Sequence, residues 1–260
     1  MTAASGSGET RALLSLRGVT VRFGGLLALR SVDLDVARGE IRGLIGPNGA
    51  GKTTLLNVIA GRFRPTAGAV MFDGRTVTGR GAHHMAALGI GRTFQHLALF
   101  AGMTVVENVM VGLHGPLTGT VAGAIGGRRE AWAHQAARKL LQRFGLEAAA
   151  NQTIASLSVA DRKRVELIRA LAAEPRMLLL DEPAAGLSGA EVRALIELLR
   201  SLRDAEGLTI VLVEHIMELV MEACDHVTVL NFGQVLAEGS PKEVRADARV
   251  VDAYLGGLTV

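Results

Sequence analysis

The sequence predicts an α/β fold in which helices flank a mostly parallel sheet, together with an antiparallel β part and an α-helical subdomain. Two all-apolar segments, 177–180 and 209–213, have the length and composition of strands buried on both faces of a parallel sheet. Segments with helical spacing follow them, as in successive β-α units. In contrast, apolar and polar residues alternate at 13–23, which predicts a half-exposed strand.

Strands dominate the first part of the chain. They are expected at 13–23, 31–36, 43–45 and 69–72. The strand at 43–45 is short and apolar, and it runs into a glycine-rich turn. A helix is expected directly after this turn, at 53–60.

The middle of the chain is predicted to be helical. Helical spacing occurs at 104–111, 129–144 and 160–173, and a Gly-rich loop is expected at 115–127. The α/β alternation then resumes with strands at 177–180 and 209–213, helices at 189–206 and 216–222, and a hairpin of 227–231 and 234–237. Pro241 is placed to open a helix, and a short helical tail follows at 250–255.

These elements predict one domain rather than several. Residues 1–11 are rich in Gly, Ser and Thr and are expected to form a disordered tail, and 12–256 to form a single domain. Within that domain, 12–95 and 175–240 are expected to form the core and 96–174 a helical subdomain that contains the loop 115–127. A C-terminal helical tail is expected at 241–260.

Composition excludes several classes of protein. Among 260 residues there are 28 Lys and Arg against 25 Asp and Glu, an excess too small to indicate nucleic-acid binding. Cys224 is the one cysteine of the chain, which excludes an intramolecular disulfide and a cysteine metal cluster. No apolar run approaches the roughly 20 residues of a membrane-spanning helix. The first residues do not have the pattern of a signal peptide.

The strongest motif lies at 46–53, where GPNGAGKT fits the pattern G-x-x-x-x-G-K-[ST] between a buried strand and a helix. Its glycines allow consecutive backbone N–H groups to face one phosphate, and the positive end of the following helix adds to the attraction. Lys52 supplies a charge for the β- and γ-phosphates, and Thr53 a hydroxyl for Mg²⁺. The motif predicts a nucleoside triphosphate site.

A second motif follows the apolar strand 177–180. Asp181 is placed to hold Mg²⁺ through its water shell, and Glu182 to polarise an attacking water as general base. A guanine-specific N-K-x-D loop is absent from the sequence. Gln95 and His215 remain as further candidates, and His215 follows a strand at the edge where open α/β sheets bind ligands.

Together these residues resemble the ATP-binding cassette of ABC transporters, from about residue 13 to 256. The segments 46–53 and 178–182 resemble the Walker A and Walker B motifs, Gln95 the Q-loop glutamine, and His215 the switch histidine. Phe23 stands where the family stacks an aromatic ring on adenine. The segment 157–161, LSVAD, stands at the signature L-S-G-G-Q but keeps only its Leu and Ser.

A narrower resemblance is to the ATP-binding subunits of branched-chain amino acid importers. It is carried by FGGLLA at 23–28, RTFQ at 92–95, DEPAAGL at 181–187, VEH at 213–215 and AYLG at 253–256. Related subunits for urea import or lipopolysaccharide export share parts of these motifs and remain alternatives. A soluble ABC ATPase that does not drive transport is a further alternative, and a small-molecule kinase a more distant one.

The resemblance implies a set of site residues. These are Phe23, Gly46, Asn48, Gly49, Gly51, Lys52, Thr53 and Thr54 around ATP, with Ser158 acting in trans; Thr53, Gln95 and Asp181 around Mg²⁺; and Glu182, His215 and Gln95 in catalysis.

The resemblance also implies partners. Two cassettes pair head to tail, integral membrane permease subunits carry the solute, and an extracytoplasmic binding protein captures it. The protein is then expected on the cytoplasmic face of the inner membrane, as a peripheral subunit without nucleic-acid partners.

The altered signature at 157–161 predicts a weak phosphate site. Ser158 and Asp161 have the spacing of a capping box, with Asp161 in the role usually taken by Glu or Gln, and Ala160 adds a Cβ where the family has glycine. Both changes weaken a phosphate site. We therefore expect a non-identical partner cassette whose signature is closer to L-S-G-G-Q.

Overall fold

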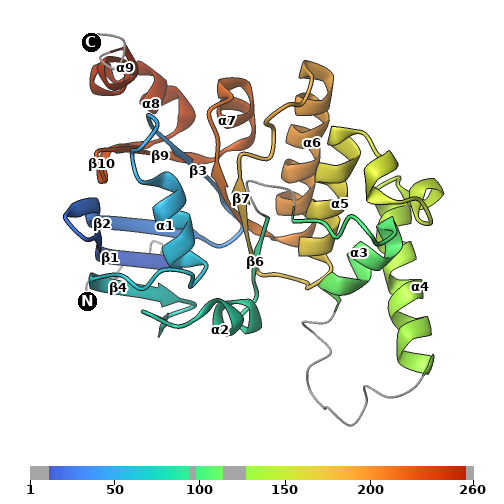
Figure 1. Ribbon diagram of the computed structural model, residues 1–260. Helices are drawn as coiled ribbons and strands as arrows, with labels where there is room; N and C mark the ends of the chain where they lie inside the picture. The colour runs from blue at the N-terminus through green and yellow to red at the C-terminus, as the bar shows by residue number, and fades with distance from the viewer. Residues whose placement is uncertain (1–11, 94–97, 114–126, 256–260) are drawn as a thin grey trace, which may run out of the picture.

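The computed structural model describes residues 12–93, 98–113 and 127–255 (Figure 1). The predicted tail at 1–11 and the predicted loop at 115–127 lie outside these residues, except Gly127, which begins a helix. An antiparallel sheet lies at one end of the molecule and a second sheet in its centre. Helices α3, α4 and α5 lie at the other end.

The N-terminal sheet is antiparallel. Its four strands are β1 (Ala12–Phe23), β2 (Leu26–Ala37), β4 (Ala67–Phe72) and β5 (Arg75–Thr76), in the order β2-β1-β4-β5. In β1, Leu14, Leu16 and Val19 are buried while intervening residues are more exposed. The alternation predicted a strand with one buried face, and the structure confirms it.

The central sheet has six strands: β3 (Ile41–Ile45), β6 (Ile90–Arg92), β7 (Met177–Asp181), β8 (Thr209–Val213), β9 (His226–Asn231) and β10 (Gln234–Gly239). Their order is β10-β9-β3-β8-β7-β6, and only β10 runs antiparallel to its neighbour. Every residue of β3, β7 and β8 is buried, as their apolar composition predicted. Parallel strands end at one edge of the sheet, so β3, β7 and β8 deliver the residues that follow them to the same edge.

Nine α-helices lie in the described part of the chain. They are α1 (Lys52–Ile59), α2 (Ala82–Ala87), α3 (Val105–Gly112), α4 (Gly127–Arg143), α5 (Val159–Leu171), α6 (Gly189–Glu206), α7 (Met217–Ala223), α8 (Pro241–Ala246) and α9 (Ala248–Leu255). Two 3₁₀ turns, Glu147–Ala149 and Ile154–Ser156, precede α5. One apolar cluster joins the antiparallel sheet and one side of the central sheet to α1 and α2, and a second joins the central sheet to α3–α9.

Two short elements were not predicted from the sequence, and one longer strand begins earlier than predicted. The strand β6 has three residues, and it becomes a strand because Ile90 and Arg92 pair with Met177 and Leu179 of β7. The strand β2 begins at Leu26 rather than at 31, because its first residues pair with the end of β1. Helix α2 has six residues and one buried side chain, Met85, too few for a visible periodicity.

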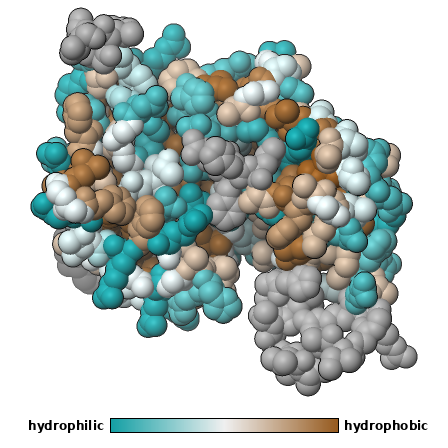
Figure 2. Space-filling model, viewed as in Figure 1, coloured by the Kyte–Doolittle hydropathy of each residue, from teal (hydrophilic) through white to brown (hydrophobic). Residues whose placement is uncertain are grey.

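Polar and apolar side chains are interspersed over the face seen in Figure 2. Among the described residues, none of the helices combines the length and the apolar character needed to cross a bilayer.

Candidate active site

The segment 46–53 connects β3 to α1, as predicted. Gly51 is the N-cap of α1 with φ of 103°, and no side chain caps the helix. The first turn of α1 also contains no acidic residue. Its backbone N–H groups are therefore not taken by a side-chain acceptor, which leaves the positive end of α1 suited to an anion.

Two glycines of this loop are required by packing. A Cβ on Gly46 would overlap the carbonyl oxygen of Leu230 in β9, and a Cβ on Gly51 would lie 2.8 Å from the carbonyl oxygen of Ala28. Gly49 has open space around it but a φ of 78°, which glycine adopts without strain. Asn48 and Thr53 are exposed at the same loop, and Thr54 is half-buried.

Lys52 folds over the loop that precedes it. Its Nζ donates to the carbonyl oxygens of Gly46 at 2.7 Å and Pro47 at 2.9 Å. Burial lowers the pKa of Lys52, while the charges of Glu182 and Asp181 act to raise it. The lysine of the first motif and the carboxylates of the second therefore lie within electrostatic reach of each other, as the sequence predicted.

Asp181 ends β7 and is 3% exposed. Its Oδ2 lies 3.3 Å from Nη2 of Arg92, whose Nη1 donates to Oδ1 of Asn57 at 2.7 Å. Its Oδ1 is buried and has no hydrogen-bond partner among the described residues. Burial raises the pKa of Asp181, and the charge of Arg92 opposes that rise. A carboxylate oxygen that is buried without a partner fits a divalent cation, since Mg²⁺ prefers oxygen ligands.

Glu182 adopts a φ of 51°, a conformation that non-glycine residues rarely take. Hydrogen bonds hold its backbone on both sides: its N–H donates to Val213 at 2.9 Å, and its carbonyl oxygen accepts from Nζ of Lys163 at 3.2 Å. Backbone strain that neighbours maintain in this way is frequent at active sites.

His215 follows β8, and its imidazole is 61% exposed. The neighbouring Glu214 is 1% exposed and acts as the anchor of this segment. Its Oε1 accepts from the N–H of Ala184 at 2.7 Å, and its Oε2 accepts from the N–H of His215 at 2.9 Å. Glu214 thus ties the loop that carries His215 to the loop after Glu182.

The sequence analysis gave Glu214, Arg92 and Lys163 no role. Each stands within the quoted motifs or beside them, but a charged residue next to a motif is by itself no signal. Their importance appears only from their contacts across the sheet edge. Gln95 lies outside the described residues.

Phe23 ends β1 and is 44% exposed. Its ring packs edge to face against Phe63, with centroids 5.3 Å apart and an interplanar angle of 75°. Phe63 follows α1 and was not singled out from the sequence. The two rings pack against each other, and part of the Phe23 ring stays exposed, where it can contact another aromatic group.

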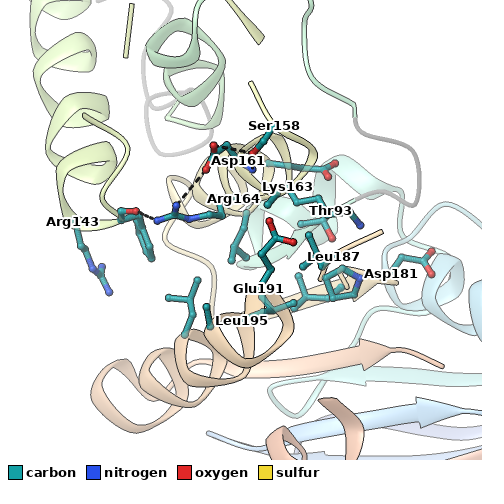
Figure 3. A pocket seen from close by; sticks show the side chains of 18 residues that line it. Thr93, Arg143, Ser158, Asp161, Lys163, Arg164, Asp181, Leu187, Glu191 and Leu195 are labelled. Atoms are coloured by element: carbon teal, nitrogen blue, oxygen red, sulfur yellow. Dashed lines mark hydrogen bonds and ion pairs between the residues drawn. The ribbon is translucent and has the colours of Figure 1, made fainter. Parts of the chain in front are cut away.

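Helix α5 begins at the altered signature (Figure 3). Oγ of Ser158 accepts from the N–H of Asp161 at 3.1 Å, which confirms the N-cap but only half of the predicted capping box, because the carboxylate of Asp161 does not bind the N–H of Ser158. The same hydroxyl donates to Oδ2 of Asp161 at 2.9 Å, so the carboxylate binds the side chain of Ser158. Arg164 donates to the other carboxylate oxygen at 3.3 Å.

A cavity of about 540 Å³ separates α5 from α6. Its lining includes Ser158, Lys163 and Glu191, and also Asp181 and Thr93 (Figure 3). The signature segment and the end of β7 therefore line one cavity of this chain.

This geometry agrees with the similarity of the chain to known proteins. The family model described as "ABC transporter" matches residues 29–185. The chain belongs to the ABC transporter ATP-binding proteins. A second model, "Branched-chain amino acid ATP-binding cassette transporter", matches residues 234–257. Such cassettes bind and hydrolyse ATP to drive transport, so the small-molecule kinase is excluded.

The chain is 43% identical over 249 residues to the high-affinity branched-chain amino acid transport ATP-binding protein LivG of Salmonella typhimurium, covering 94% of this chain and 98% of the relative. It is 41% identical over 252 residues to BraF of Pseudomonas aeruginosa, a protein with the same description, covering 95% and 99%.

Solved cassettes share the fold. The ADP conformation of the ATP-binding cassette MJ1267 superposes with a TM-score of 0.82 at 30% identity, covering 95% of this chain and 100% of that one. The cassette MJ0796, a dimer bound to ADP and phosphate, superposes with a TM-score of 0.75 at 29% identity, covering 88% and 98%.

Proposed function

We propose that the protein is the ATP-hydrolysing subunit of a high-affinity importer of branched-chain amino acids. The observation that carries this proposal is the near full-length similarity to LivG and BraF, supported by the separate match of residues 234–257. Import of urea and export of lipopolysaccharide remain the alternatives, since subunits for these solutes share parts of the same motifs.

The proposed nucleotide site follows from the loop geometry. The phosphates of ATP lie on the N–H groups of the loop and of the first turn of α1, at Gly49, Gly51, Lys52 and Thr54, and Phe23 stacks on the adenine. Lys52 then exchanges its loop carbonyl partners for phosphate oxygens. Asn48 and Gly46 complete the loop.

We place Mg²⁺ at Thr53, Asp181 and Gln95, because the unpartnered Oδ1 of Asp181 needs a ligand. When bound, the ion neutralises charge that develops on the transferred phosphoryl group. Arg92 orients Asp181 by holding its other oxygen.

Glu182 is the proposed general base, and it takes a proton from the attacking water. The bond from Lys163 to its carbonyl oxygen holds the strained backbone that aims the carboxylate. His215 and Gln95 are proposed to contact the γ-phosphate and the water. Glu214 positions His215 through the backbone.

The membrane partner is proposed to dock beside the helical subdomain, 96–174, where it meets the core, 12–95 and 175–240. A groove of about 990 Å³ lies there, lined among others by Phe100, Arg169 and Arg176. Phe100 is 48% exposed, with the guanidinium of Arg169 6.0 Å from its ring centre. We place the protein on the cytoplasmic face of the inner membrane, attached through permease subunits at this groove.

The second cassette is proposed to be a non-identical chain, paired head to tail. In the partner's site, Ser158 would face the γ-phosphate, yet its hydroxyl is bonded to Asp161. A carboxylate in the first turn of α5 repels an anion. A partner with a glycine-rich signature would complete the site formed by Lys52 and Glu182 of this chain.

Deletion of the coding sequence in its own cells tests the proposed solute. We expect uptake of labelled leucine to fall and to return with the wild-type chain but not with Glu182→Gln. Normal leucine uptake together with lost urea uptake would contradict the proposal. Phe100→Asp should bind ATP normally but no longer co-purify with membrane subunits, and Val251→Asp, on an exposed site of α9, serves as the control.

A further inference from the structure

Helix α5 carries three charged residues at intervals of three positions, Lys163, Glu166 and Arg169. Residues with this spacing lie along one side of a helix. Glu166 is 4% exposed, and Lys163 and Arg169 are half-buried on either side of it. A buried carboxylate is costly unless opposite charges lie beside it, and the two cations meet that need. These three residues are called the charged row of α5 below.

One end of the charged row is Lys163, which contacts the turn that holds Glu182. Its Nζ donates to the carbonyl oxygen of Glu182 at 3.2 Å. The same oxygen accepts from the N–H of Ala185, also at 3.2 Å, so both of its lone pairs are used. Burial lowers the pKa of Lys163, and nearby carboxylates, those of Glu214 and Glu166 among them, oppose that fall. Lys163 therefore faces both the middle of the row and the catalytic turn.

The other end is Arg169, which contacts the loop before α3. Its Nη1 donates to the carbonyl oxygen of Ala98 at 2.6 Å, and its guanidinium lies 6.0 Å from the ring centre of Phe100. Oε1 of Glu166 accepts from the N–H of Ala98 at 3.4 Å and lies 3.9 Å from Nη2 of Arg169. The side chain of Asn108 in α3 holds the same loop, since it bonds to both the N–H and the carbonyl oxygen of Phe100. The loop is thus fixed to α3 and α5.

The charged row lies between the two hollows described above. Lys163 and Glu166 line the cavity of about 540 Å³, which also has Asp181 on its wall. Arg169 lines the groove of about 990 Å³ where the membrane partner is proposed to dock. Lys163 and Arg169 are six positions apart in one helix, a rise of about 9 Å. The row therefore spans the distance from the docking groove to the catalytic turn.

We infer that Glu166 is a positioning residue that connects the docking groove to the general base. It holds Arg169 and Lys163 in line, so that the placement of the loop before α3 sets the placement of the turn at Glu182. Chains of contacting charged side chains can carry such coupling between separate sites. This role rests on the proposed function, because it takes Glu182 as the base and the groove as the docking site.

A double-mutant cycle on the full chain tests the connection. Arg169→Met changes the end of the row that bonds to Ala98, and we expect it to lower the kcat for ATP about 3- to 30-fold with an unchanged KM. Lys163→Met should lower the kcat at least as much. Because Arg169 acts through Lys163, adding Arg169→Met to Lys163→Met should cause no further loss. Losses that multiply, or a normal kcat for Arg169→Met alone, would overturn this role.

Glu166→Gln tests the middle of the row, and it does so even if a methionine variant fails to fold. It keeps the shape of the side chain and removes the charge, so the kcat should fall in the same range while the dissociation constant of ATP stays unchanged. The matched control is Lys139→Met, at an exposed position of α4, which should keep the kcat of the wild type. An unchanged kcat for Glu166→Gln, or an equal loss for Lys139→Met, would contradict the connection.

These outcomes are separable from those of the proposed function. Turnover retained by Glu182→Gln would refute the base, and normal assembly of Phe100→Asp with membrane subunits would refute the docking site. If only the connection between them is wrong, Glu182→Gln loses turnover and Phe100→Asp loses assembly, but Glu166→Gln keeps the kcat of the wild type.

Discussion

The first turns of helices α1 and α5 are built in opposite ways. The N-cap of α1 is Gly51, with no capping side chain and no acidic residue in the first turn. The N-cap of α5 is Ser158, which is bonded to Asp161 in the first turn. Both helices expose N–H groups and a positive dipole end, yet only α1 leaves them free of a side-chain acceptor.

The two helix N-termini differ in whether they favour the stability of the helix or the binding of an anion. A capped terminus stabilises its helix, because its orphan donors are satisfied within the chain. An uncapped terminus is less stable alone and gains that stabilisation from an anion. In the proposed site the N–H groups of α1 are therefore available to phosphate, whereas the first turn of α5 is already capped by Ser158.

The largest expected effect is a loss of ATP turnover, caused by Glu182→Gln. ATP binding should persist while turnover falls about 10²–10⁴-fold, because the general base is lost. Phosphate release and ATP affinity measure the two properties separately. The control is Glu197→Gln, at an exposed position of α6, which should keep normal turnover. Turnover retained by Glu182→Gln would assign the base to another residue.

The next largest effect is expected on ATP binding, from a substitution that gives the first turn of α1 a carboxylate like that of α5. Thr54 holds the third position of α1, as Asp161 does in α5. Thr54→Asp should weaken ATP binding about 10- to 100-fold, since it places a carboxylate within several ångströms of the phosphates. Thr54→Asn, which has nearly the same shape without the charge, should lose much less. Equal losses measured by calorimetry would show that shape rather than charge governs the site.

The reverse change would make α5 resemble the signature of its family. Ala160→Gly together with Asp161→Gln should raise the ATPase rate of the isolated chain by up to about 10-fold, since a neutral first turn no longer repels phosphate. Val159→Ala, in the same turn and 47% exposed, should change little. Fast hydrolysis by the unaltered chain alone would refute both the weak signature and the need for a non-identical partner.

The smallest effect concerns stability. Ser158→Ala removes the cap of α5 and should cost about 1 kcal/mol. In a chain of this size that corresponds to a fall of about 2–4 °C in Tm. Ser201→Ala, at an exposed position within α6, is the control and should not lower Tm. A Tm unchanged by Ser158→Ala would mean that the bonds between Ser158 and Asp161 add nothing to the folded state.

Features that depend only on neighbouring residues could be predicted from the sequence. Apolar runs specified the buried strands β7 and β8, alternation specified β1, and the glycine pattern at 46–53 specified the phosphate loop. The cap at Ser158 was also predictable, because capping joins residues three positions apart. Such signals lie within one window of the chain.

Tertiary structure alone decided the contacts that support the site. Arg92 reaches Asp181 and Asn57 only because β6 pairs with β7 beside α1, and Glu214 reaches Ala184 only because β8 lies next to β7. These partners are far apart in the chain, and their meeting depends on which strands pair and which faces are buried, which no local pattern of residues encodes.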